Sequence, residues 1–265
     1  MVPTLVHVGR WGLPTHDVFT ALGVFVAFLV FVWEARHRGR LDERLAIVAA
    51  GCLLGAGLGA RAAFVWRYVS VAPAPTVQGF LVQGGKSVVG GLAGAYAGAV
   101  LAKRMIGYRE KTGDLFAPAV ASGMAVGRIG CFLTEAPGTP TTLPWGIRLN
   151  ATQIASIPNC TRCVQGIAYH PSILYEIVFL LALAVALFWL RPRLSVPGEL
   201  FTVFLLSYAI FRFGIEFVRG NPTMAFGLSG TQLFLVPSTM LLTAALYRGR
   251  RPARRASSAM REGSI

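Results

Sequence analysis

The chain has 265 residues, of which 54% are hydrophobic and only 14% are charged. Soluble domains carry about 25% charged residues, so this composition excludes an ordinary soluble protein and predicts a single integral membrane domain over residues 1–265. The net charge of +14 does not indicate nucleic-acid binding, because the basic residues cluster beside apolar segments, where they attract the headgroups of anionic membrane lipids.

Seven apolar segments are long enough to cross a hydrocarbon core of about 30 Å, which takes roughly 20 residues each. We therefore predict an all-α polytopic membrane protein with seven transmembrane helices, at about 17–34, 45–66, 86–105, 114–134, 170–190, 198–218 and 230–247. The first segment lacks a small-residue cleavage site and precedes further spans, which indicates a retained helix rather than a signal peptide. Small residues in the third segment favour close helix packing. The fourth contains an arginine and several glycines, so we expect a weak span that could be broken or re-entrant.

Lysine and arginine are concentrated after the first, third and fifth segments and in the tail, residues 248–265. By the positive-inside rule, this distribution predicts an outside N-terminus and a cytoplasmic C-terminus with a solvated basic tail. The longest connection, about 135–169, then faces outward. It contains four prolines, which predict an irregular but ordered cap: Pro137, Pro140, Pro144 and Pro158.

Two of the four cysteines form a C-x-x-C pattern in this outward connection. Cys160 and Cys163 would meet an oxidising environment there, which favours a disulfide, but the short spacing leaves a metal or redox role open. The other two, Cys52 and Cys131, lie in apolar segments, where we expect small buried hydrophobic residues.

Three arginines interrupt the apolar segments at depth: Arg61, Arg128 and Arg212. A charged side chain near the bilayer centre costs roughly 2.5–3.5 kcal/mol on insertion scales. Such residues pair with an acid, line a wet cavity or bind an anion. Three in one small membrane protein indicate an anionic group that is handled inside the bilayer.

The sixth segment ends in a charged pattern in which Arg212, Glu216 and Arg219 lie on one helix face. A carboxylate between two guanidiniums can hold them in place, and the guanidinium fork matches phosphate oxygens. The alternative is an ion-paired helix that only stabilises the bundle.

A second polar group, His170-Pro171-Ser172-Ile173-Leu174-Tyr175-Glu176, opens the fifth segment. His170 could cap the helix or carry a proton at neutral pH. Tyr175 and Glu176 could bond to an arginine or anchor the membrane interface. With the predicted orientation, this group, Arg128 and the Arg212 pattern converge in the outer part of the membrane.

Together these motifs resemble the prolipoprotein diacylglyceryl transferases, which are bacterial seven-helix membrane enzymes. The family's H-P-S-x-L-Y-E motif is matched at 170–176, its G-R-x-G signature at 127–132 and its R-F-x-x-E-F-x-R motif at 212–219. Weaker matches lie at Asp114–Pro118, Gly59-Ala60-Arg61 and Ser229-Gly230-Thr231-Gln232. The motifs occur in the same order over most of the chain.

The resemblance implies transfer of the diacylglyceryl group of phosphatidylglycerol to the lipobox cysteine thiol of a preprolipoprotein, with release of glycerol phosphate, in the bacterial plasma (inner) membrane. The substrate supplies the thiol, so we expect no nucleophile, metal or cofactor from this chain. The implied catalytic residues are Arg128, Arg212 and Glu216, since arginine donors would stabilise the departing phosphate. The implied substrate-binding residues are Arg61, Gly90, Gly91, His170, Ser172, Tyr175, Glu176, Arg219 and Gln232.

The sequence departs from the family pattern at several positions. Val89 precedes the Gly-Gly pair where the family has a histidine, and Cys131 replaces the signature asparagine. Glu135 is displaced by one position, and Phe19 is the nearest candidate for an aromatic residue of the first span. These departures motivate an alternative, a non-catalytic or differently specific paralogue that binds anionic phospholipid. A lipid transporter or scramblase is less favoured because we find no internal repeat.

Overall fold

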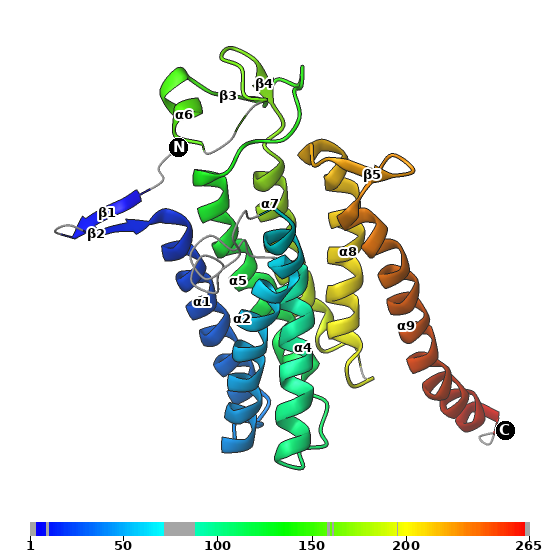
Figure 1. The fold of residues 1–265 in the computed structure, drawn as a ribbon. Helices are drawn as coiled ribbons and strands as arrows, with labels where there is room; N and C mark the ends of the chain where they lie inside the picture. Colours follow the sequence, from blue (N-terminus) through cyan, green and yellow to red (C-terminus); the bar gives the residue numbers. More distant parts are fainter. Residues whose placement is uncertain are drawn as a thin grey trace. The chain divides into compact units, whose positions relative to one another are not determined.

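The computed structural model describes residues 4–8, 11–71, 88–157, 160, 162–194 and 196–262. It divides into two compact units, one formed by Met1–Glu34 with Lys111–Ile265 and the other by Ala35–Glu110. Both units are built mainly from long helices (Figure 1).

The first unit contains most of the helices and all of the described strands. Its helices are α1 (Thr15–His37, whose last residues belong to the second unit), α5 (Gly113–Thr134), α6 (Ala151–Ala155), α7 (Ser172–Leu190), α8 (Glu199–Arg219) and α9 (Gly230–Glu262). Three antiparallel hairpins pair β1 (Thr4–Val8) with β2 (Trp11–Pro14), β3 (Ile147–Arg148) with β4 (Ala168–Tyr169), and β5 (Thr223–Ala225) with β6 (Leu228–Ser229). The backbone of α9 continues past the predicted span end at 247, so the basic tail is helical as far as Glu262.

The core of this unit lies where α5, α7 and α8 meet. Alanines on α5, including Ala117 and Ala121, leave room for the larger Leu187 of α7 and Phe204 of α8, and all four side chains are buried. Although it contains Pro118, α5 is continuous from Gly113 to Thr134, so the suggestion of a broken fourth segment was wrong.

Glycine pairs bring the helices of the second unit, α2 (Glu43–Val71) and α4 (Val88–Met105), into close contact. A Cβ atom on Gly55 would clash with the carbonyl oxygen of Gly94, and one on Gly59 would clash with that of Gly90. Small residues permit this close approach of two helix backbones. The predicted close packing of segment 86–105 is therefore confirmed.

Six described helices are long and apolar enough to cross a membrane, namely α1, α2, α5, α7, α8 and the first part of α9. On α7, large apolar side chains at Val178, Leu181, Val185 and Trp189 are exposed, as expected for a face that contacts lipid. The seventh predicted span coincides with α4, which carries four glycines and two basic residues and is not among the six. That span stays a prediction.

The connection 135–169 is ordered by its own short elements in the described residues. The α6 helix begins with a capping box between Asn150 and Gln153, and the buried Tyr169 accepts a hydrogen bond from the Val164 amide at 2.8 Å. Cys160 and Cys163 form a disulfide, which was one of the predicted alternatives. Of the four prolines used in the prediction, Pro158 lies outside the described residues.

Candidate functional site

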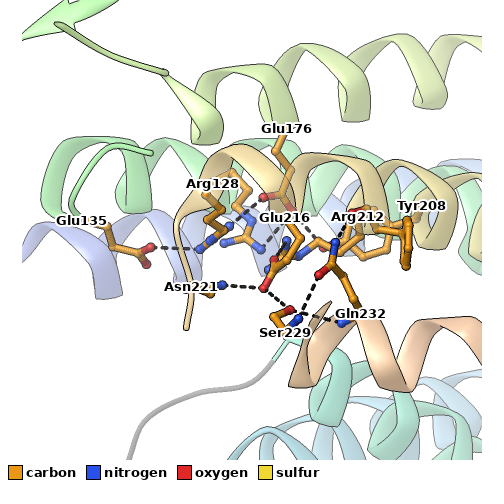
Figure 2. Close-up of polar contacts among 11 residues, drawn as sticks. Arg128, Glu135, Glu176, Tyr208, Arg212, Glu216, Asn221, Ser229 and Gln232 are labelled. Carbon is orange, nitrogen blue, oxygen red and sulfur yellow. Dashed lines mark hydrogen bonds and ion pairs between the residues drawn. The ribbon is translucent and has the colours of Figure 1, made fainter. Parts of the chain in front are cut away.

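The charged side chains of α5, α7 and α8 converge inside the first unit (Figure 2). Arg128 comes from α5, Glu176 from the first turns of α7, and Arg212 with Glu216 from α8. All four are buried, which is unusual for charged residues unless they are paired. We call Arg128, Glu176, Arg212, Glu216 and Arg219 the arginine cluster.

Glu176 is the carboxylate that connects α5, α7 and α8. It lies 2.9 Å from the Arg128 guanidinium and 3.3 Å from that of Arg219, and the Tyr208 hydroxyl donates to it at 2.8 Å. The side chain is fully buried, so these donors replace the water that a carboxylate would otherwise bind. Glu176 therefore holds two arginines of different helices in place.

Glu216 forms the second centre of the cluster. It pairs with Arg212 one helical turn earlier, which confirms the predicted i,i+4 ion pair on α8. Its Oε1 atom accepts hydrogen bonds from Asn221 at 2.7 Å and from the Ser229 hydroxyl at 2.8 Å. Glu216 was expected to lie between Arg212 and Arg219, but Arg219 instead contacts Glu176 and, at 3.3 Å, Glu135.

Gln232 positions the start of α9 against this centre. Its side-chain oxygen accepts a hydrogen bond from the backbone amide of Ser229 at 2.9 Å, and the backbone amide of Gln232 donates to the Ser229 hydroxyl at 3.3 Å. Together these two hydrogen bonds form a capping box. Its side-chain nitrogen donates to the carbonyl of Phe213 at 3.2 Å. Gln232 therefore orients Ser229, which in turn holds Glu216.

The other predicted residues at the start of α7 do not join the arginine cluster through their described contacts. The Tyr175 hydroxyl accepts from the Trp145 indole at 2.7 Å and lies 3.4 Å from Nδ1 of the half-buried His170. The His170 side chain does not cap α7, whose N-cap residue is Pro171.

Ser172 is buried, and its hydroxyl has no hydrogen-bond partner among the described residues. The side chain lines a small crevice together with Phe132, Glu135 and Ile173. A buried polar group without a partner costs free energy, and the crevice beside this hydroxyl has a volume of about 10 Å³, which is room for one water molecule.

Three predicted substrate-binding residues belong to the second unit. Arg61 is half-buried on α2, and Gly90 and Gly91 are in the first turn of α4. The carbonyl of Gly90 lies against Gly59, so the helix packing already explains why Gly59 lacks a side chain. A role of these three residues in binding stays a prediction.

The predicted site residues did not include Tyr208, Asn221 or Ser229, although Ser229 opens the motif at 229–232. Tyr208 had a detectable signal, because it lies four residues before Arg212 and so on the same face of α8. Asn221 and Ser229 follow α8 in the chain, and nothing in their spacing predicts that both reach Glu216.

A family model described as prolipoprotein diacylglyceryl transferase matches residues 3–248. The chain belongs to the prolipoprotein diacylglyceryl transferase family. It is therefore a transferase, and its apolar helices make it a multi-pass membrane protein.

Curated relatives in this family extend over nearly the same length. The phosphatidylglycerol–prolipoprotein diacylglyceryl transferase of Methylobacillus flagellatus is 31% identical over 258 residues, which cover 89% of this chain and 91% of the relative. The enzyme of the same name from Synechococcus elongatus is 31% identical, with 87% and 81% covered. That of Clostridium tetani is 25% identical, with 91% and 95% covered.

Proposed function

We propose that the protein transfers the diacylglyceryl group of phosphatidylglycerol to the lipobox cysteine thiol of a preprolipoprotein and releases glycerol phosphate. Family membership over nearly the whole chain supports this activity, and the names of the curated relatives contain both substrates. The arginine cluster supplies the chemistry that the reaction requires. The alternative, a paralogue that only binds anionic phospholipid, is not favoured.

The charge of the arginine cluster is the observation that carries the proposal. Three guanidiniums are matched there by only two fully enclosed carboxylates, Glu176 and Glu216. The third carboxylate, Glu135, is at the edge with 40% of its side chain exposed. Among these three guanidiniums and two enclosed carboxylates alone, the excess is one positive charge, which would complement the single negative charge of the phosphodiester in phosphatidylglycerol.

Arg128 and Arg212 are the residues that we assign to the phosphate. Each guanidinium has five N–H donors, more than the carboxylate beside it can accept, so donors remain for phosphate oxygens. When the substrate thiolate attacks the glyceryl carbon, an S–C bond forms and the C–O bond to phosphate breaks. The electron pair stays on the phosphate oxygen, whose increasing negative charge the arginines stabilise.

The remaining residues of the site orient these two arginines or contact the substrates. Glu176 and Arg219 position Arg128, and Glu216 positions Arg212. We assign the Ser172 hydroxyl to a polar atom of the substrate, because it is buried and has no partner among the described residues. We assign contact with lipid or peptide to His170 and Tyr175. A role of Arg61, Gly90 and Gly91 in binding stays a prediction.

We also propose the finer membrane arrangement, with seven transmembrane helices, an outside N-terminus and a cytoplasmic C-terminus in the inner membrane of a bacterium. The distribution of lysine and arginine supports this orientation. Arg128 and Arg212 would then lie in the outer half of the bilayer. A preprolipoprotein presents its cysteine there after export.

The test is an assay with purified protein, phosphatidylglycerol vesicles and a lipobox peptide, in which glycerol phosphate release and the peptide mass are followed together. Arg128→Ala and Arg212→Ala should each lower the turnover number about 100- to 1,000-fold, because each removes donors at the developing charge. Arg109→Ala, which removes an exposed arginine outside the cluster, is the matched control.

Two results would contradict the proposal. Full activity in folded Arg128→Ala and Arg212→Ala proteins would reject the arginine mechanism. Binding of phosphatidylglycerol by the wild-type protein without release of glycerol phosphate would establish the non-catalytic alternative.

A further inference from the structure

Three side chains at the edge of the arginine cluster lie together where α1 begins and α5 ends. They are His16, Cys131 and Glu135, and each offers one ligand atom that lies within 4.8 Å of the other two. Cys131 is buried, while His16 and Glu135 are half-buried. The three residues combine an imidazole, a thiol and a carboxylate, which are the three ligand types that zinc prefers.

The backbone explains why these residues meet. Cys131 and Glu135 are four apart at the end of α5 and so share one face. Between α5 and the first turn of α1 there is no room for a side chain at Gly130, whose Cβ would lie 2.8 Å from Phe19 Cβ and 3.2 Å from His16 Cα. The glycine therefore allows His16 to approach the cysteine and the glutamate.

The geometry needs little adjustment to hold a metal ion. With zinc bonds of about 2.0–2.3 Å, the ligand atoms of a tetrahedral site are about 3.5 Å apart, so the distances between these three atoms would have to shorten by up to about 1.3 Å. Three protein ligands with an open fourth position are typical of catalytic rather than structural zinc sites. Asp17 Oδ1 lies 3.4 Å from His16 Nδ1, where a carboxylate commonly orients a zinc-binding histidine.

The electrostatics of the three ligands also suit a divalent cation. A zinc ion with one thiolate, one carboxylate and one neutral imidazole has no net charge, which lowers the cost of placing it in the membrane. Arg128 lies 3.7 Å from Cys131 Sγ, and Arg219 lies 3.3 Å from Glu135. These contacts place the three side chains directly beside the arginine cluster.

We propose that His16, Cys131 and Glu135 bind a zinc ion whose fourth position takes the lipobox cysteine as a thiolate. This inference rests on the proposed function, and it replaces our expectation from the sequence that the chain holds no metal. On binding, the substrate thiol gives its proton to water. The zinc-bound sulfur then forms the S–C bond as the phosphate, held by the arginines, leaves with the electron pair of the C–O bond.

The first experiment measures zinc by mass spectrometry in full-length protein, purified through a tag without histidines and dialysed after incubation with zinc. We expect about one zinc per chain in the wild type, and about a tenfold or greater loss in Cys131→Ser, His16→Phe and Glu135→Gln. Cys52→Ser removes the other free cysteine and should keep the metal. The double variant Cys160→Ser/Cys163→Ser should also keep it.

Cobalt provides a second readout that does not depend on activity. Cobalt-loaded wild-type protein should show a thiolate-to-cobalt band in the near ultraviolet, which Cys131→Ser abolishes. The band should intensify when a lipobox peptide is added, but not when the added peptide has serine in place of its cysteine. This increase would report the second sulfur ligand, the substrate thiolate.

Several results would overturn the inference. Zinc that stays bound in both Cys131→Ser and His16→Phe, or that disappears in the Cys160/Cys163 double variant, places the metal elsewhere. A cobalt spectrum that the lipobox peptide does not change would show that the substrate thiolate does not bind at the fourth position. Transfer by a zinc-free wild-type protein rejects the metal site but leaves the proposed function intact, whereas loss of that function would appear in the arginine variants.

Discussion

At the scale of single residues, the site depends on buried charges that satisfy one another. Glu176 is fully buried, and its charge would strongly destabilise the fold if it were unpaired. Arg128 and Arg219 form ion pairs with its carboxylate, and Tyr208 donates a hydrogen bond to it. Any change at one member therefore alters the position or the free energy of the others. Tyr208 offers the mildest way to test this coupling because only its hydroxyl is involved.

Tyr208→Phe removes one hydrogen bond to a charged group, which contributes about 1.5–3 kcal/mol to stability. We expect a lower thermal unfolding midpoint in detergent and a several-fold fall in the turnover number, because Glu176 would hold Arg128 less firmly. Tyr96→Phe, at a residue that is 65% exposed, should change neither quantity. Equal unfolding midpoints for both variants would show that the Tyr208 hydrogen bond contributes nothing.

At the scale of elements, helix ends and glycine contacts set the arrangement around the site. The carboxylate of Asp114, at the start of α5, accepts hydrogen bonds from the amides of Gly198 at 2.7 Å and Phe201 at 3.1 Å. These amides belong to the first turn of α8 and its preceding residue, where backbone donors have no partner within the helix. Asp114 thus ties α8, which carries Arg212, to α5, which carries Arg128.

Asp114→Ala should lower the free energy of unfolding by about 1 kcal/mol, the usual effect of losing a helix cap. Asp114→Asn keeps one acceptor oxygen and should lower the free energy of unfolding by less than Asp114→Ala does. Urea unfolding in mixed micelles, followed by circular dichroism, would compare the two. If alanine and asparagine were equally destabilising, the negative charge rather than the capping bonds would be responsible.

Substitution of Gly55 tests the close packing of α2 and α4 in the second unit. A Cβ atom there would clash with the carbonyl of Gly94, whereas Gly57 on the same helix has nothing within 4 Å. Gly55→Ala should therefore destabilise by about 1–3 kcal/mol through overpacking. Gly57→Ala should be neutral or slightly stabilising, since alanine is the better helix former. Similar thermal midpoints of the two variants would contradict the packing that we describe.

At the scale of the whole molecule, the function requires the exported thiol and the membrane lipid to reach one site. The proposed orientation places the connection 135–169 outside and the basic tail in the cytoplasm. Two cysteine substitutions test this orientation in intact cells. Thr142→Cys, at an exposed residue, should react with a membrane-impermeant maleimide, and Ser258→Cys should react only after lysis. The reverse pattern would invert the topology and place the arginine cluster in the inner half of the bilayer.

Much of the architecture is determined by local features of the sequence. Apolar runs of about 20 residues predict membrane spans because a bilayer excludes unpaired backbone groups, and six described helices agree with the prediction. The i,i+4 pairing of Arg212 with Glu216 follows from helix geometry alone. The motifs also sufficed to identify the family, which the family model matches over residues 3–248.

Which residues meet across helices was decided only by the tertiary structure. Glu176 is shared by arginines 48 positions before it and 43 after it, and His16 reaches Cys131 through a glycine contact that no periodicity predicts. Such pairings depend on how each helix rotates about its axis and on how closely two backbones approach. The sequence determines which face of a helix is polar, but packing between helices determines what that face touches.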